Sequence, residues 1–197
     1  MVGRTLRGIA AGATGTAALN IATYVDMVMR GHPSSQVPAK VAGALTQSVG
    51  MPLEAEANGK EGVSHDEQTK AKHRLSGLGA LMGYGTGLGI GALYGLARPM
   101  LRRLPLPLAG LAMGAAAMAG SDVLATITKA TNPKAWRAAG WAADIIPHAI
   151  YGLVTVLTYE AYADDLRAYR APIPAEAAAR FGAVPGPALL PCHPHDG

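Results

Sequence analysis

The stretch GLGALMGYGTGLGIGALYG, residues 77–95, decides the fold that we expect. Glycines recur in it at every fourth residue: Gly79, Gly83, Gly87, Gly91 and Gly95. No charged residue falls between Ser76 and Ala97. In water each glycine inside a helix costs about 1 kcal/mol relative to alanine. In a bilayer an unpaired backbone group costs more than that, so the segment stays helical, and glycines four apart form a groove for a second helix. We therefore expect a membrane-spanning helix against which other helices pack.

The composition is that of an apolar helical chain. Of its 197 residues, 50% are hydrophobic and 15% are charged, and that charged share is well below the usual quarter. The net charge of +4 is scattered, and no run of basic residues alternates with aromatic ones, so we expect no nucleic-acid partner. The single cysteine excludes an intramolecular disulfide.

Four segments are long enough to cross a bilayer, which takes roughly 20 residues. We expect spans at residues 8–29, 75–97, 106–128 and 141–162, and therefore an all-α, four-span transmembrane helical bundle with glycine-rich packing. Gly110 and Gly114 give the third span a groove of its own. The first span follows a basic start without a small-x-small cleavage site, so we expect it to be retained as an anchor.

The segments outside the spans are polar. Residues 31–63 form a loop in which Pro38 opens one short amphipathic helix. Ser64 and Glu67 make a capping-box pattern, which predicts a helix that runs directly into the second span. Residues 171–197 are rich in proline and alanine and are expected to form a mostly disordered tail.

Four spans place both termini on one side of the membrane. The short connection from Arg98 to Arg103 concentrates positive charge close to that side, which favours cytoplasmic termini. The composition, rich in alanine and glycine, looks like that of a high-GC actinobacterium. The lipid bilayer is the expected partner, together with a second copy of the chain or another membrane protein.

Polar side chains interrupt the apolar spans. The up-down order of the spans puts the following groups in the same half of the bilayer: Asp26, Asp122, Asp144, His148 and Tyr151. An isolated aspartate at mid-membrane costs roughly 3 kcal/mol, so such residues turn inward and find partners.

Three interpretations of this polar cluster stay open. It is a structural network; or it is a proton or cation site, which suits a histidine that titrates near pH 6.5; or it holds a catalytic metal. The last lacks an HExxH motif and a second histidine, so we expect no metal.

Catalytic motifs are not found. The glycines of residues 77–95 follow no strand and precede no Gly-Lys-Ser/Thr, so they are no phosphate loop, and no Gly-x-Ser-x-Gly elbow occurs. We expect a non-enzymatic membrane component without a cofactor, able to self-associate through its glycine ridges. The alternative is a small proton- or cation-coupled transporter or channel subunit that uses the polar cluster.

The chain resembles bacterial inner-membrane proteins of the YagU-like kind. The resemblance rests on RGHPSS at residues 30–35, on GALYG at residues 91–95, and on Trp141 with the polar residues that follow it in the fourth span. It covers residues 5–160 in outline. It implies a location and a topology more than an activity.

Overall fold

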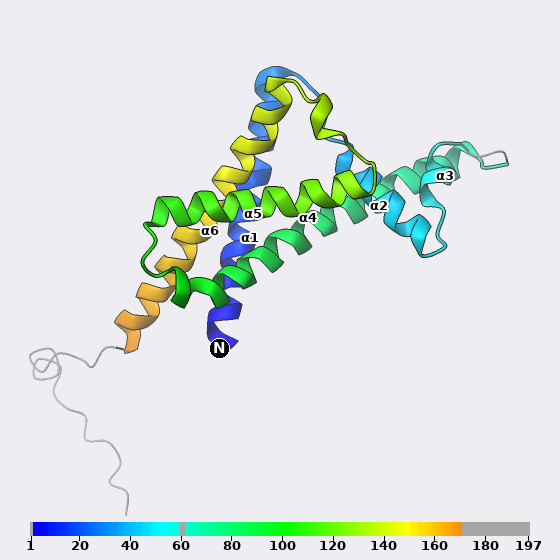
Figure 1. Ribbon diagram of the computed structural model, residues 1–197. Helices are drawn as coiled ribbons and strands as arrows, with labels where there is room; N and C mark the ends of the chain where they lie inside the picture. The colour runs from blue at the N-terminus through cyan, green and yellow to red at the C-terminus, as the bar shows by residue number, and fades with distance from the viewer. Residues whose placement is uncertain (1, 60–61, 171–197) are drawn as a thin grey trace, which may run out of the picture. The chain divides into compact units, whose positions relative to one another are not determined.

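The structure is a computed structural model that describes residues 2–59 and 62–170 (Figure 1). These residues form helices joined by short connections and contain no strand, so the all-α class is confirmed. The elements in chain order are α1 (Val2–Arg30), α2 (Val37–Ser48), α3 (Leu53–Ala57), α4 (His65–Leu101), α5 (Leu106–Ile127), the 3-10 turn η1 (Pro133–Ala135) and α6 (Ala138–Arg170). The described residues divide after Ala163, and those before this point form one compact unit. The expected tail, residues 171–197, lies outside the described residues.

Two helices are long and apolar enough to cross a membrane: Leu106–Ile127 and Ala138–Ala163. They coincide with the third and fourth expected spans. The first and second expected spans fall within α1 and α4, where glycine, threonine and polar residues dilute the apolar side chains. Length and composition therefore single out two spans, and not the four that we expected.

The long helices meet through small residues, and each runs opposite to the next along the chain. Gly8 and Gly12 of α1 pack on the backbone of Gly91 of α4. Gly15 of α1 lies against Tyr151 of α6. Contacts that ascend along α1 descend along α4, from Gly91 to Gly87, and descend along α6, where Arg7 lies against Tyr159 and Gly15 against Tyr151.

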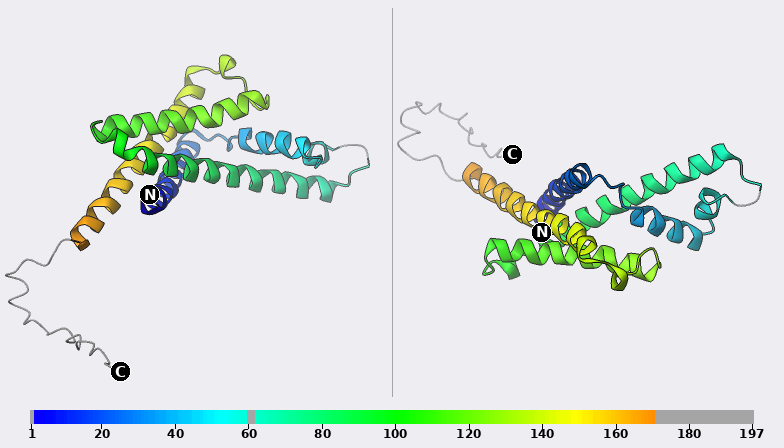
Figure 2. Two further views of the ribbon diagram at one scale, coloured as in Figure 1. Left: turned by 60° about the horizontal axis from the view of Figure 1, so that its bottom comes forward. Right: turned by 90° about the horizontal axis from the view of Figure 1, so that it is seen from above.

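Helices α2 and α3 lie along the first half of α4 (Figure 2). Gly79 packs on the backbone of Pro38, and a small apolar cluster joins the three helices: Ala42, Ala57, Ala71 and Leu75. The expected helix after Pro38 is present as α2. We expected one short helix within residues 31–63, and the structure has a second, α3, which buries Ala57 in this cluster although it carries Glu54 and Glu56.

The ends of α4 follow the local sequence. The predicted capping box is confirmed, because the Ser64 hydroxyl accepts from the Glu67 N–H while the Glu67 carboxylate accepts from the Ser64 N–H. The helix continues past Pro99 to Leu101, four residues beyond the end of the expected span at residue 97. Proline lacks the N–H that would bond to the i−4 oxygen, and the helix ends two residues after it.

Candidate functional site

Close contact between α5 and α6 positions the candidate site. A Cβ added to Gly152 of α6 would overlap the backbone of Gly110 and lie 2.8 Å from the Cα of Gly114. Gly114 in turn packs on the backbone of His148. Because the two helices run in opposite directions, the polar residues near the end of α5 come beside the first turns of α6.

His148 is the centre of this polar group. Its Nδ1 lies 2.8 Å from the backbone oxygen of Asp144 and 3.3 Å from the Oδ1 of the same residue. Its Nε2 lies 3.4 Å from the Oγ of Ser121 on α5. Two acceptors beside Nδ1 hold a hydrogen on that nitrogen, so in the neutral ring Nε2 is the acceptor. After protonation both ring nitrogens donate, and the Ser121 hydroxyl accepts.

Two carboxylates border the ring. The charged groups that act on Asp122 are Asp144 and His148, so the three side chains form one electrostatic unit. The Oδ2 of Asp144 is buried and has no hydrogen-bond partner among the described residues. Two like-charged carboxylates thus lie beside one imidazole, which can balance part of their charge.

This unit, which we call the α5–α6 polar cluster, consists of Ser121, Asp122, Asp144 and His148. Within the described part of the chain, no set of three or more histidine, cysteine or acidic side chains has the geometry to hold a metal. The arrangement can accept, hold and release a proton, and the unpartnered Asp144 oxygen is an acceptor for a small cation or a water molecule.

Asp26 forms its polar contacts with residues close to it in sequence, on α1 and the turn that follows. Its carboxylate forms an ion pair with Arg30 one turn later and lies 2.8 Å from the Nε2 of His32. Gly31 has a φ of 64°, and this left-handed turn brings His32 back toward the end of α1.

Tyr151 also lies apart from the α5–α6 polar cluster. Its ring lies against Gly15 of α1, and its hydroxyl donates to the backbone oxygen of Gly87 of α4 at 2.7 Å. Of the five polar residues that we singled out, the structure groups Asp122, Asp144 and His148.

Most of the predicted packing glycines lie at helix contacts. Gly87, Gly91 and Gly95 face α1, and Gly79 faces α2. A Cβ on Gly83 would meet nothing within 4 Å, so this glycine points into open space, unlike the other four of its series. Gly110 and Gly114 pack on α6 and not on the glycine-rich helix.

Two polar contributors, Ser121 and Glu160, were not predicted from the sequence. Ser121 precedes Asp122 directly, and a hydroxyl in an otherwise apolar helix was the available signal. Glu160 forms an ion pair with Arg98 and accepts from the Tyr94 hydroxyl at 3.3 Å, and thereby links α4 to α6. Its signal was a lone acidic residue inside the aromatic end of the fourth span.

The comparisons with known proteins give no relative. No protein-family model, no curated protein and no solved structure matches the chain.

Proposed function

We propose that the chain is an integral membrane protein with four spans, at residues 8–29, 75–97, 106–128 and 141–162. The observation that carries this proposal is that small residues are inside and large apolar ones outside. The buried residues of α1 are Gly8, Ala11, Gly12, Gly15 and Thr16. Its large apolar side chains are exposed, among them Leu6, Ile21, Val25 and Val28.

The same arrangement, with small residues buried and large apolar ones exposed, occurs in α5, one of the two helices apolar enough to cross a membrane. Its buried residues are mostly glycine and alanine, while Leu108, Leu111 and Val123 are about half exposed. Water disfavours such a surface by about 25 cal/mol for each Å² of apolar area. Lipid does not, and small residues inside are the usual means of close helix packing in membranes.

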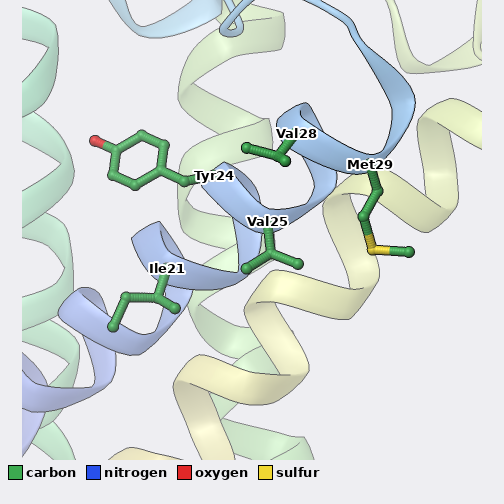
Figure 3. A pocket seen from close by; sticks show the side chains of 5 residues that line it. All are labelled: Ile21, Tyr24, Val25, Val28 and Met29. Atoms are coloured by element: carbon green, nitrogen blue, oxygen red, sulfur yellow. The ribbon is translucent and has the colours of Figure 1, made fainter.

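The far end of α1 illustrates this surface (Figure 3). A shallow hollow there is lined by apolar side chains from this helix alone: Ile21, Tyr24, Val25, Val28 and Met29. Acyl chains are the expected neighbours of this hollow.

Contacts within the chain support including α1 and α4 among the spans. Gly8, Gly12 and Gly91 bring the backbones of the two helices together, so each covers the weakly apolar face of the other. A glycine-rich helix that inserts poorly alone is stabilised in this way by its neighbours.

The proposed setting is the bacterial inner membrane with cytoplasmic termini, consistent with the YagU-like resemblance. The proposed role is that of a non-enzymatic membrane component. Self-association would use glycines that the fold leaves open, such as Gly83, Gly85 and Gly89, because those facing α1 and α2 are already occupied.

Cysteine accessibility tests both the insertion and the topology. In a Cys192→Ser background, Asn58→Cys and Met100→Cys are labelled with a membrane-impermeant maleimide in intact spheroplasts. We expect label on Asn58→Cys at once and on Met100→Cys only after permeabilisation. Release of the chain from membranes by alkaline carbonate would refute the proposal.

A second candidate function is a proton or cation pathway through the α5–α6 polar cluster, favoured by the unpartnered Oδ2 of Asp144. In proteoliposomes, Asp144→Asn and His148→Ala are expected to abolish pH-driven flux, while Asp26→Asn leaves it intact. Equal flux in all three variants, with the fold retained, would show that the cluster is structural.

A further inference from the structure

A basic surface lies where α1 begins and α4 ends. The backbone of Arg4 packs on Gly95, one turn before Arg98. Leu101 and Leu104 pack on the core and hold down the connection between α4 and α5, which leaves Arg102 and Arg103 exposed. We call this surface the terminal arginine cluster. It consists of Arg4, Arg7, Arg98, Arg102 and Arg103.

This cluster carries a large excess of positive charge. Among the described side chains, the carboxylate in contact with the terminal arginine cluster is that of Glu160, which forms an ion pair with Arg98. The guanidinium of Arg7 lies 5.7 Å from the centre of the Tyr159 ring. Among the side chains that the structure describes, none forms an ion pair with the other three arginines.

Exposed apolar side chains border the arginines. Leu6 is 60% exposed, Leu96 43% and Met100 87%, and each lies within four residues of an arginine of the cluster. The surface thus offers guanidinium groups beside a bare apolar flank. This pairing matches a phosphate that is attached to acyl chains better than it matches a free anion.

We propose that the terminal arginine cluster binds the headgroup of an anionic phospholipid in the leaflet that it faces. Arginine suits this role because its planar group makes paired hydrogen bonds to phosphate oxygens. Leu6, Leu96 and Met100 contact the acyl chains. The inference rests on the proposed membrane location, and it assigns to this end of the protein a lipid that stabilises the contact between α1 and α4.

The test uses the full chain purified in a neutral detergent. Its thermal unfolding midpoint is followed while phosphatidylglycerol is titrated into the micelles, with phosphatidylcholine and soluble glycerol phosphate as parallel arms. We expect phosphatidylglycerol alone to raise the midpoint. Arg4→Ala, Arg102→Ala and Arg103→Ala together should raise the apparent dissociation constant by more than about tenfold, since each basic group near an anionic surface contributes roughly fivefold.

A matched triple variant controls for the loss of charge. Lys40→Ala, Lys134→Ala and Arg137→Ala remove the same charge from exposed positions elsewhere. This control should keep the response to phosphatidylglycerol. If the first triple variant does not fold, Arg102→Gln with Arg103→Gln in the exposed turn replaces it.

The inference would be overturned if both triple variants weakened the binding of phosphatidylglycerol equally. It would also be overturned if glycerol phosphate raised the unfolding midpoint as much as phosphatidylglycerol does. Either result leaves the membrane location standing, provided that the chain resists carbonate extraction. A chain that carbonate releases would instead remove the proposed function itself.

Discussion

The hydroxyl of Tyr151 on α6 donates a hydrogen bond of 2.7 Å to the backbone oxygen of Gly87 on α4. Tyr151 is 1% exposed, and Thr16 of α1 fills the space where Gly87 would carry a side chain. Three helices therefore meet at one glycine. The glycines spaced four residues apart leave room for the side chains of a tyrosine and a threonine as well as for a helix backbone.

Tyr151→Phe should lower the stability of the folded chain in detergent by about 0.5–1 kcal/mol. The magnitude is that of an interhelical hydrogen bond in a membrane protein, and the Gly87 oxygen keeps its helical partner after the change. Equilibrium unfolding monitored by circular dichroism measures it. Tyr162→Phe, at a 40% exposed position of the same helix, should have no effect. Equal losses in both variants would argue against the contact.

Gly91 and Gly89 should respond to alanine with opposite signs. A Cβ on Gly91 would lie 2.7 Å from the Cα of Gly12, so Gly91→Ala should cost about 1–3 kcal/mol by overpacking. A Cβ on Gly89 meets nothing within 4 Å, so Gly89→Ala should gain up to about 1 kcal/mol from helix propensity. Unfolding midpoints of the two variants decide the matter, and a shift of the same sign in both would contradict the packing described here.

Much of the helical framework could be predicted because its signals are local. The capping box at Ser64 specifies the start of α4, and Pro38 in the first turn specifies α2. Helix α3 could not be predicted in this way, because it is stabilised by the burial of Ala57 against residues of α2 and α4. Contacts with segments distant in sequence leave no local pattern.

The candidate site was predicted in part for a similar reason. The i, i+4 spacing of Asp144 and His148 gives their pairing directly. Up-down order alone placed Asp26 in the same group, whereas the turn at Gly31 supplies it with His32 as a nearer partner. Asp26 therefore pairs with Arg30 and His32, both within six residues of it.

The turn after α1 should loosen as the pH rises through the neutral range. Hydrogen bonding to the Pro33 carbonyl, and then to the Asp26 carboxylate, raises the pKa of His32 above its ordinary value of 6.5. Because its pKa is higher in the folded chain, protonated His32 stabilises the fold fully at a pH below its pKa in the unfolded chain. This stabilisation is lost as the pH rises through its pKa in the folded chain. Hydrogen exchange at the Gly31 amide, which donates to Met27, should accelerate over that interval beyond its intrinsic pH dependence.

Replacing His32 separates this effect from any other titration. His32→Gln should remove the extra pH dependence at Gly31, and His65→Gln should leave it unchanged. Persistence of the effect in His32→Gln would assign it to a different group.

The ion pair between Arg98 and Glu160 should couple α4 to α6. Their side chains are 20% and 17% exposed, so the pair is partly shielded from water, and Tyr94 adds a hydrogen bond to the same carboxylate. In a double-mutant cycle of Arg98→Met and Glu160→Gln we expect a coupling free energy of about 1 kcal/mol, near the upper end for exposed pairs. It should shrink as salt is raised, because the screening length falls to about 3 Å at 1 M. A matched cycle at Lys70 and Asp66, whose ion pair is well exposed, should give a smaller value. If the two cycles agree, the contact between Arg98 and Glu160 does not join the helices, and packing around Tyr94 and Tyr159 must do so instead.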